Sequence, residues 1–234
     1  MARLTRLAVG GHAHLVLLRG HSGRPVFRDD VDRAAFLSAL RAACALELVA
    51  LHGFALLPER VWLLATPAGA DALGRTLQAL GRRFSTAFNR RHGRRGSLWD
   101  GRYRSAVVED GPSLLEAMLF VDLAPARAGA SPDALATPWS SARTHVGQST
   151  EFSLTDAAIY WSLGNTPFDR CTSYRLLLDE SQTGETVQRI ESAVLRGWAL
   201  GTKAFQERLA RQLARPMAPR PRGRPRRPSA SEVP

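Results

Sequence analysis

The sequence has little cysteine and no long hydrophobic run. Its two cysteines, Cys44 and Cys171, lie far apart without metal ligands at suitable spacing, so neither a disulfide framework nor a zinc site is expected. Cys44 lies in an apolar segment and is predicted to be a buried packing thiol. No apolar stretch approaches the ~18 residues of a membrane-spanning helix, and no signal-peptide hydrophobic region is recognised. These absences favour a protein of the reducing cytoplasm.

Acidic residues are the minority among the charged side chains. The 234 residues include 32 Lys and Arg against 21 Asp and Glu, which gives a net charge of +11 and a pI near 11.2. Such an excess favours a polyanionic partner. A soluble basic surface without a partner is the alternative, but the clustering of the charge favours nucleic acid. We therefore expect a cytoplasmic, nucleoid-associated protein, and charge alone does not exclude RNA.

The basic residues concentrate between residues 81 and 104. Arginine recurs from Gly81 to Arg95 with no acidic residue between them. Arginine forks match phosphate geometry and give affinity with little sequence preference. A solvated charged face is the alternative, but such a face normally mixes both signs. The candidates for nucleic-acid contact are Arg82, Arg83, Asn89, Arg90, Arg91, Arg94, Arg95, Trp99, Arg102 and Arg104.

The C-terminal segment 216–234 is rich in Pro, Arg and Ser and is predicted to be disordered when unbound. Its centre, Arg222, Gly223, Arg224 and Pro225, resembles an AT-hook. Glycine lets such a backbone lie deep in the minor groove of A·T-rich duplex, and the arginines follow its negative potential. An unspecific basic tail is the alternative.

Hydrophobic periodicity predicts the order of elements that precedes this tail. Strands are expected at His12–Leu18, Leu46–Leu57, Arg60–Ala65 and Tyr103–Val108. Helices are expected from Asp30 with Val31, Phe36, Leu37 and Leu40 as the apolar face, over 71–91, and after Pro112. Further helical segments are expected at Ala157–Leu163, Tyr174–Leu178, Val187–Leu195 and Lys203–Leu213. We divide the chain into a domain over 1–148, a helical region over 149–215 and the tail over 216–234.

Two segments resemble motifs of a known family. The segment from Leu57 to Pro67 is similar to the metal-binding strand of single-tyrosine HUH transposases, specifically the REP-associated branch, and the segment from Leu119 to Gly129 is similar to their nucleophile helix. Further similar blocks include Gly96–Ser105, Pro138–Ser141 and Gly197–Gly201, so the resemblance covers nearly the whole chain. It implies an α+β fold, a ferredoxin-like antiparallel sheet with helices on one face, to which we add a small C-terminal helical appendage. It also implies hairpin or single-stranded DNA as the partner.

The resemblance also shows which chemical groups are missing. The family uses two histidines to bind a divalent metal such as Mg or Mn, a tyrosine nucleophile, and a further polar ligand four residues later. These positions hold Arg60, Trp62, Phe120 and Ala124. Phe120 has no hydroxyl, Arg60 stays cationic, Trp62 offers only an N–H donor, and Ala124 offers no ligand. We therefore expect no catalytic residues, no retained metal and a DNA-binding protein that does not cleave.

Several alternatives remain open at the level of the sequence. Arg60 and Trp62 could grip a phosphate and stack a base, or Arg60 could be solvated while Trp62 covers apolar surface. An active transposase with rearranged residues would need substitutes, for example His12 and His14 as metal ligands and Tyr103 as nucleophile. Ordinary packing of these three residues is the competing interpretation. A decaying copy with no selected role is the third possibility.

Overall fold

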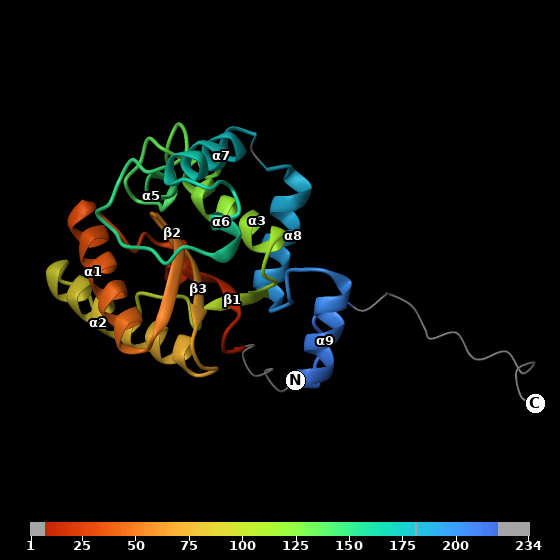
Figure 1. Ribbon diagram of the computed structural model, residues 1–234. Coiled ribbons are helices and arrows are strands. Elements are labelled where there is room, and N and C mark those ends of the chain that lie inside the picture. Colours follow the sequence, from red (N-terminus) through yellow and green to blue (C-terminus); the bar gives the residue numbers. More distant parts are fainter. Residues whose placement is uncertain (1–7, 181, 220–234) are drawn as a thin grey trace, which may run out of the picture.

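The computed structural model describes residues 8–180 and 182–219 (Figure 1). The elements follow in the order β1 (Ala13–Arg19), η1 (His21–Gly23), α1 (Asp30–Leu46), β2 (Val49–Leu57), β3 (Arg60–Pro67), α2 (Ala72–Arg91), β4 (Arg104–Val108), α3 (Pro112–Asp122), α4 (Ala124–Arg127), α5 (Ala142–His145), α6 (Ala158–Trp161), α7 (Pro167–Asp179), α8 (Gly184–Arg196) and α9 (Lys203–Leu213). Within the described ranges, no helix has both the length and the apolarity to cross a bilayer.

The four strands form one antiparallel sheet in the order β2-β3-β1-β4. Strand β1 is central, and its His14 lies opposite Ala65 of β3 on one side and Val107 of β4 on the other. Helix α1 connects β1 to β2, and helix α2 connects β3 to β4. This is the ferredoxin-like arrangement, so the predicted α+β fold is confirmed.

Helices cover both faces of this sheet (Figure 1). Because alternate side chains of a strand point to opposite faces, Val16 and Leu63 pack with residues of α1 and α2, which lie side by side. Leu15 and Trp62 point the other way and pack with residues of α3. The helices of the ferredoxin-like unit therefore lie on one face, as expected, and α3 begins a second helical layer.

The C-terminal helices belong to that second layer. Tyr174 of α7 and Val194 of α8 are buried in the same apolar cluster as α3. The residues that follow α8 also extend the sheet, since the Leu200 N–H donates to the Val107 carbonyl oxygen of β4 at 2.8 Å. At the opposite edge the Leu56 N–H of β2 donates to the Trp139 carbonyl oxygen at 2.8 Å. Both edges are thus partly paired, while the division into three regions stays a prediction.

A buried polar cluster fixes the end of α3. Asp122 is fully buried and accepts hydrogen bonds from the Ser141 hydroxyl and, at 2.8 Å, from the Tyr174 hydroxyl. His145 Nδ1 lies 2.6 Å from the Asp122 carboxylate, and its Nε2 lies 2.9 Å from the His52 carbonyl oxygen. Burial disfavours the imidazolium, but the charge and hydrogen bond of Asp122 outweigh it and raise the pKa of His145. The cluster therefore joins α3 to α5 and α7.

Local sequence signals explain where several helices begin. The Asp29 carboxylate accepts from the Asp32 N–H at the start of α1, and Pro112 occupies the first turn of α3. Thr166 and Asp169 form a reciprocal capping box at the start of α7. Helix α7 consequently begins at Pro167, before the segment expected at Tyr174–Leu178, and this Thr-Pro signal in the sequence was missed.

Two predictions about individual residues, Val31 and Leu46, are wrong, and the predicted burial of Cys44 is confirmed. Val31 is 60% exposed instead of facing the core, whereas Asp32 is 2% exposed because it accepts from the Arg28 N–H and contacts His92. Leu46 is the last residue of α1 and not the first of a strand. Cys44 is buried as predicted, and burial raises the pKa of its thiol to about 11.

Candidate nucleic-acid interface

The structure brings together the positions to which the resemblance assigns a metal and a nucleophile. Arg60 and Trp62 lie on β3, Phe120 on α3 and Ala124 on α4. The Trp62 and Phe120 rings meet edge to face, with centroids 4.9 Å apart and an interplanar angle of 89°. Trp62 is 2% exposed, Phe120 0% and Ala124 2%. Trp62 therefore covers apolar surface and offers no ring face to a base, the second of the alternatives left open above.

An arginine that the sequence analysis gave no role lies against this aromatic pair. The Arg127 guanidinium is 4.1 Å from the Phe120 ring centroid and donates to the Phe120 carbonyl oxygen at 3.0 Å. Displacement of water lowers the pKa of Arg127 to about 10; Glu191 opposes this shift and the positive charge of Arg60 adds to it. Arg60 Nε lies 2.9 Å from the Glu59 carboxylate. Two cations thus border the aromatic pair. The sequence carried one signal for this contact, because Arg127 follows Phe120 by about two helical turns.

These residues do not fit the metal that the family uses. Arginine and tryptophan side chains present N–H donors, and Ala124 presents only a methyl group. Within residues 8–180 and 182–219, no three His, Cys, Asp or Glu side chains gather closely enough to hold a metal ion. What Arg60 and Arg127 can do is attract an anion, because guanidinium groups bind phosphate oxygens.

The suggested substitutes for the metal ligands lie elsewhere. His14 alternates along β1 with Leu15, so it lies on the face opposite Phe120. Its Nδ1 lies 2.8 Å from the His12 carbonyl oxygen, and its Nε2 accepts from the Val9 N–H at 3.2 Å. Burial lowers the pKa of His14 to about 4. The packing interpretation accounts for both ring nitrogens of this residue.

The suggested substitute nucleophile also lies on the other face of the sheet. Tyr103 precedes β4 and packs with the cluster beneath α1 and α2, whereas Phe120 belongs to the opposite cluster. Its hydroxyl is 3.9 Å from the position that a Cβ on Gly74 of α2 would take. Tyr103 is therefore separated by the sheet from Arg60 and Arg127.

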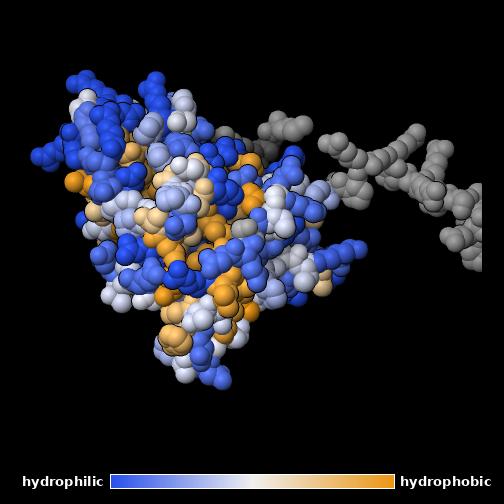
Figure 2. Space-filling model, turned by 90° about the horizontal axis from the view of Figure 1, so that it is seen from above, coloured by the Kyte–Doolittle hydropathy of each residue, from blue (hydrophilic) through white to orange (hydrophobic). Residues whose placement is uncertain are grey.

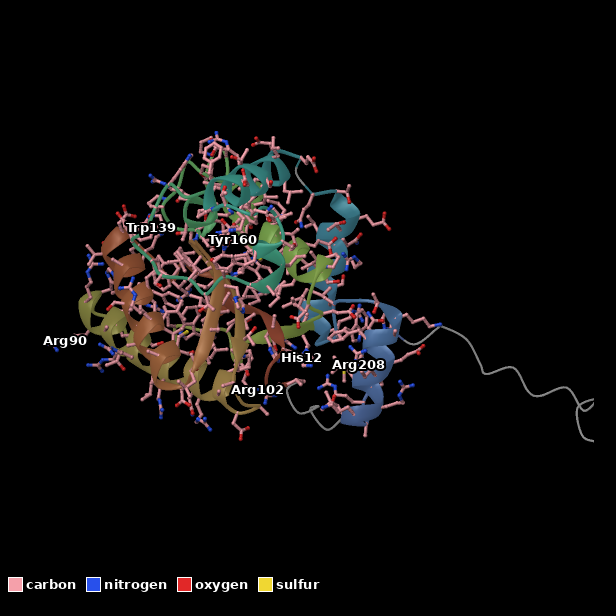
Figure 3. The ribbon with its side chains drawn as sticks, in the orientation of Figure 1. His12, Arg90, Arg102, Trp139, Tyr160 and Arg208 are labelled. Atoms are coloured by element: carbon pink, nitrogen blue, oxygen red, sulfur yellow. The ribbon has the colours of Figure 1, made fainter. Side chains whose placement is uncertain are left out.

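Most of the predicted arginines lie on the surface of α2 and the following segment. Figure 2 shows strongly hydrophilic side chains on the side of the molecule where Figure 1 has α1 and α2. In Figure 3, Arg90 points outward near the end of α2, and Arg102 points outward near its start. The exposed members on this side are Arg82, Arg83, Arg90, Arg91, Arg95 and Arg102, while Arg94 is half-buried. Arg104 is exposed too, but it lies opposite Leu17 and alternates with Ser105, so it points to the face of the sheet that carries Trp62. This arginine face runs along the length of α2.

Arg91 differs from the other arginines of this face because its charge is already paired with two aspartates. Its two terminal nitrogens each lie 2.7 Å from an Asp29 carboxylate oxygen, and one lies 2.5 Å from Asp32. His92 Nε2 also contacts the Asp32 carboxylate at 2.9 Å. Arg91 therefore joins the end of α2 to the start of α1 and is the least available of the set for phosphate.

Two further predicted residues brace the segment after α2. The Asn89 amide donates to the Gly96 carbonyl oxygen at 2.9 Å, which closes the loop between them. The Trp99 ring packs 6.1 Å from Phe84 and 6.1 Å from Phe36, centroid to centroid. These two side chains shape the arginine face from beneath.

A groove of about 770 Å³ separates α2 from the segment 99–103. Gly74 and Gly81 lie seven residues apart on α2 and both line it, so their lack of side chains leaves room there. The Trp99 Nε1 is buried and finds no hydrogen-bond partner among the described residues. The remaining lining includes Gln78, Arg82, Arg102 and Tyr103. A cationic groove of this kind suits a phosphodiester backbone.

The AT-hook-like residues cannot be placed in this interface. Arg222, Gly223, Arg224 and Pro225 lie outside the described residues. Their proposed contact with A·T-rich duplex therefore remains a prediction from the sequence.

Comparison with known proteins identifies the fold. No family model matches the sequence, and no curated protein matches it. Among solved structures, the chain is similar to a REP-associated tyrosine transposase bound to a REP hairpin, with a TM-score of 0.52 and 14% identity over 68% of this chain and 96% of that one. A candidate transposase from Deinococcus radiodurans R1 matches with a TM-score of 0.35 and 23% identity over 47% of this chain and 87% of that one. The chain has a transposase fold.

Proposed function

We propose that this chain is a DNA-binding protein with a transposase fold that has lost DNA cleavage and strand transfer. The observation that carries the proposal is the buried contact between Trp62 and Phe120, with centroids 4.9 Å apart. The resemblance assigns to these positions the metal ligands and the tyrosine hydroxyl that the family needs. A degenerate centre of this kind would bind DNA without forming a covalent intermediate.

The partner that we propose is hairpin or single-stranded DNA at repeat elements. The arginine face of α2 supplies fixed positive charge, and Arg60 with Arg127 supplies a second cationic point. The similar transposase of known structure was solved with a REP hairpin, which supports a folded DNA strand as the partner here. The AT-hook-like tail would add affinity for duplex DNA by raising the effective concentration. A repressor or accessory role in the nucleoid follows from these parts.

The test is binding of a labelled DNA hairpin by the full chain at several salt concentrations. An unstructured strand and an RNA hairpin of equal length serve as competitors. Removing surface arginines as R82Q, R83Q and R90Q weakens binding and lowers the slope of log K against log salt by about 0.7–0.9 for each phosphate that is no longer neutralised. R175Q, an exposed arginine of α7, is the matched control and leaves the slope unchanged.

Three outcomes would contradict the proposal. Equal affinity for hairpin and unstructured strand would remove hairpin recognition and favour a decaying copy. An equal decrease in affinity in R175Q and R83Q would mean that the charge acts without a defined face. A covalent protein–DNA adduct on a denaturing gel with Mg²⁺ or Mn²⁺ would establish the alternative, an active transposase that uses rearranged residues.

A further inference from the structure

A second cavity, of about 410 Å³, lies where α1, the edge strand β2 and the segment 138–152 meet. Its volume is in the range of about 300–1,000 Å³ that is usual for small-ligand sites. Its lining contains no residue of α2, so it is distinct from the groove beside the arginine face. Figure 3 shows Trp139, one of its lining residues, beside α1.

The lining combines cations with aromatic rings. Arg41 comes from α1 and Arg143 from α5, so two guanidinium groups line one cavity from separate elements. Trp139 and Phe152 contribute flat apolar surface. Glu151 is an exposed acidic residue of the same lining. Two arginines against one carboxylate leave an excess of positive charge in this lining.

Arg41 is held in position without being neutralised. Its guanidinium donates to the backbone carbonyl oxygen of Glu151 at 2.8 Å and lies 4.7 Å from the Phe152 ring centroid. Phe152 packs in turn on Phe54 of β2, with centroids 5.0 Å apart. Because the acceptor is a neutral carbonyl, the positive charge of Arg41 remains available to an anion.

Two polar atoms of the lining are buried and unpaired. Ser140 is 3% exposed, and its hydroxyl finds no hydrogen-bond partner among the described residues. The Arg143 Nε is likewise buried without a partner in the described part of the chain. Ser141, the residue after Ser140, by contrast forms hydrogen bonds with both the Asp122 carboxylate and the Phe54 backbone. Buried polar atoms are normally paired in native proteins, so these two atoms point to a missing partner.

We propose that this cavity binds one nucleotide, with its phosphate against Arg41 and Arg143 and its base along Trp139. Guanidinium groups bind phosphate oxygens through charge-assisted hydrogen bonds, and an aromatic ring receives the face of any base. The Ser140 hydroxyl and the Arg143 Nε supply further hydrogen bonds. The nucleotide is either free or unpaired within a strand, since the same chemistry binds both. This site does not depend on the proposed function of the arginine face.

The test is calorimetric titration of the full chain with adenosine 5′-monophosphate and thymidine 5′-monophosphate. Inorganic phosphate and adenosine are titrated separately, because each represents one part of the nucleotide. A short unstructured oligonucleotide represents the strand. We expect one nucleotide per chain, bound more tightly than either half. R143Q and R41Q each weaken binding about tenfold or more, because each removes hydrogen bonds from a charged group. R175Q, outside the cavity, leaves it unchanged.

Ser140 and Ser141 give a matched pair that separates binding from folding. S140A removes an unpaired buried hydroxyl, so it maintains or raises the melting temperature while it weakens nucleotide binding. S141A removes a hydroxyl that bonds Asp122, so it lowers the melting temperature. A purely structural Ser140 would instead lower the melting temperature in S140A and leave nucleotide affinity unchanged.

Further results decide whether the bound nucleotide is free or part of a strand, and whether the inference holds. Tighter binding of the oligonucleotide than of the free monophosphates, when R41Q and R143Q both weaken it, identifies an unpaired nucleotide of a strand, and the reverse order identifies a free ligand. Binding no tighter than that of inorganic phosphate overturns the inference, as does equal affinity in wild type, R143Q and R41Q. Hairpin affinity is measured on the same samples. Its persistence when nucleotide binding fails would leave the proposed function intact.

Discussion

Replacing Phe120 with tyrosine tests the proposed loss of DNA cleavage directly. The substitution restores the hydroxyl that the resemblance assigns to this position, on a side chain that is 0% exposed. Its ring already contacts Trp62 at 4.9 Å and the Arg127 guanidinium at 4.1 Å, centroid to centroid and centroid to carbon. The added oxygen must therefore enter a packed interior, so we expect F120Y to destabilise the protein and to restore no cleavage.

The magnitude follows from packing and from hydrogen bonding. Inserting one heavy atom into a packed core, or burying a hydroxyl without a partner, costs about 1–3 kcal/mol. For a protein of this length, each kcal/mol lowers the melting temperature by about 2–4 °C. F120Y should therefore melt roughly 2–12 °C below wild type. F168Y is the matched control, since Phe168 is 77% exposed and its change should cost less than about 0.5 kcal/mol.

Two measurements check this prediction. Thermal unfolding followed by circular dichroism compares F120Y, F168Y and wild type. A denaturing gel then examines F120Y after incubation with labelled hairpin DNA and Mg²⁺ or Mn²⁺. An unchanged melting temperature would show that the surroundings of Phe120 are open rather than packed. A covalent adduct would refute the argument that one hydroxyl cannot restore the chemistry.

Four further predictions concern stability. G81A should stabilise α2 by up to about 1 kcal/mol, because a Cβ at Gly81 would meet only the Trp99 ring at 3.8 Å; a lower melting temperature would contradict this. R91Q should lower the melting temperature, because Arg91 bonds Asp29 and Asp32, whereas R90Q on the exposed surface should not; equal effects would refute the assigned pairing. Native His14 has a lower pKa than in the unfolded chain, so its contribution, about 3 kcal/mol, should be lost as pH falls from 6.5 to about 4 in urea titrations, and H14Q should reduce that loss. His145 acts in the opposite sense, because its raised native pKa stabilises the fold below pH 6.5 and this contribution fades as pH rises through that pKa; H145Q should reduce the alkaline loss.

Much of the fold could be predicted from the sequence because its signals are local. Strand β1 begins one residue after its predicted start, and α9 has its predicted bounds of Lys203–Leu213. Alternation and helical periodicity report burial within a few residues of chain. The same rule failed at Val31, because the burial of Asp32 depends on Arg91 and His92 some 60 residues away.

The candidate sites were predicted less completely for the same reason. Arg127 matters through its contact with Phe120 and its charge relation to Arg60 on another element. The nucleotide cavity joins Arg41 to Arg143 across about a hundred residues of chain, and no local pattern connects them. Contacts of this kind become visible only when the chain is folded.

By itself, the sequence determined which chemical groups exist at each position. Phe120 has no hydroxyl and Ala124 no ligand in any fold, because these properties belong to the covalent structure of each residue. Tertiary structure alone decided which groups are available. It buried Trp62 against Phe120 and paired Arg91 with two aspartates, but it left Arg90 exposed. Burial and ion pairing depend on partners distant in the chain, so only the packing of helices on the sheet determines them.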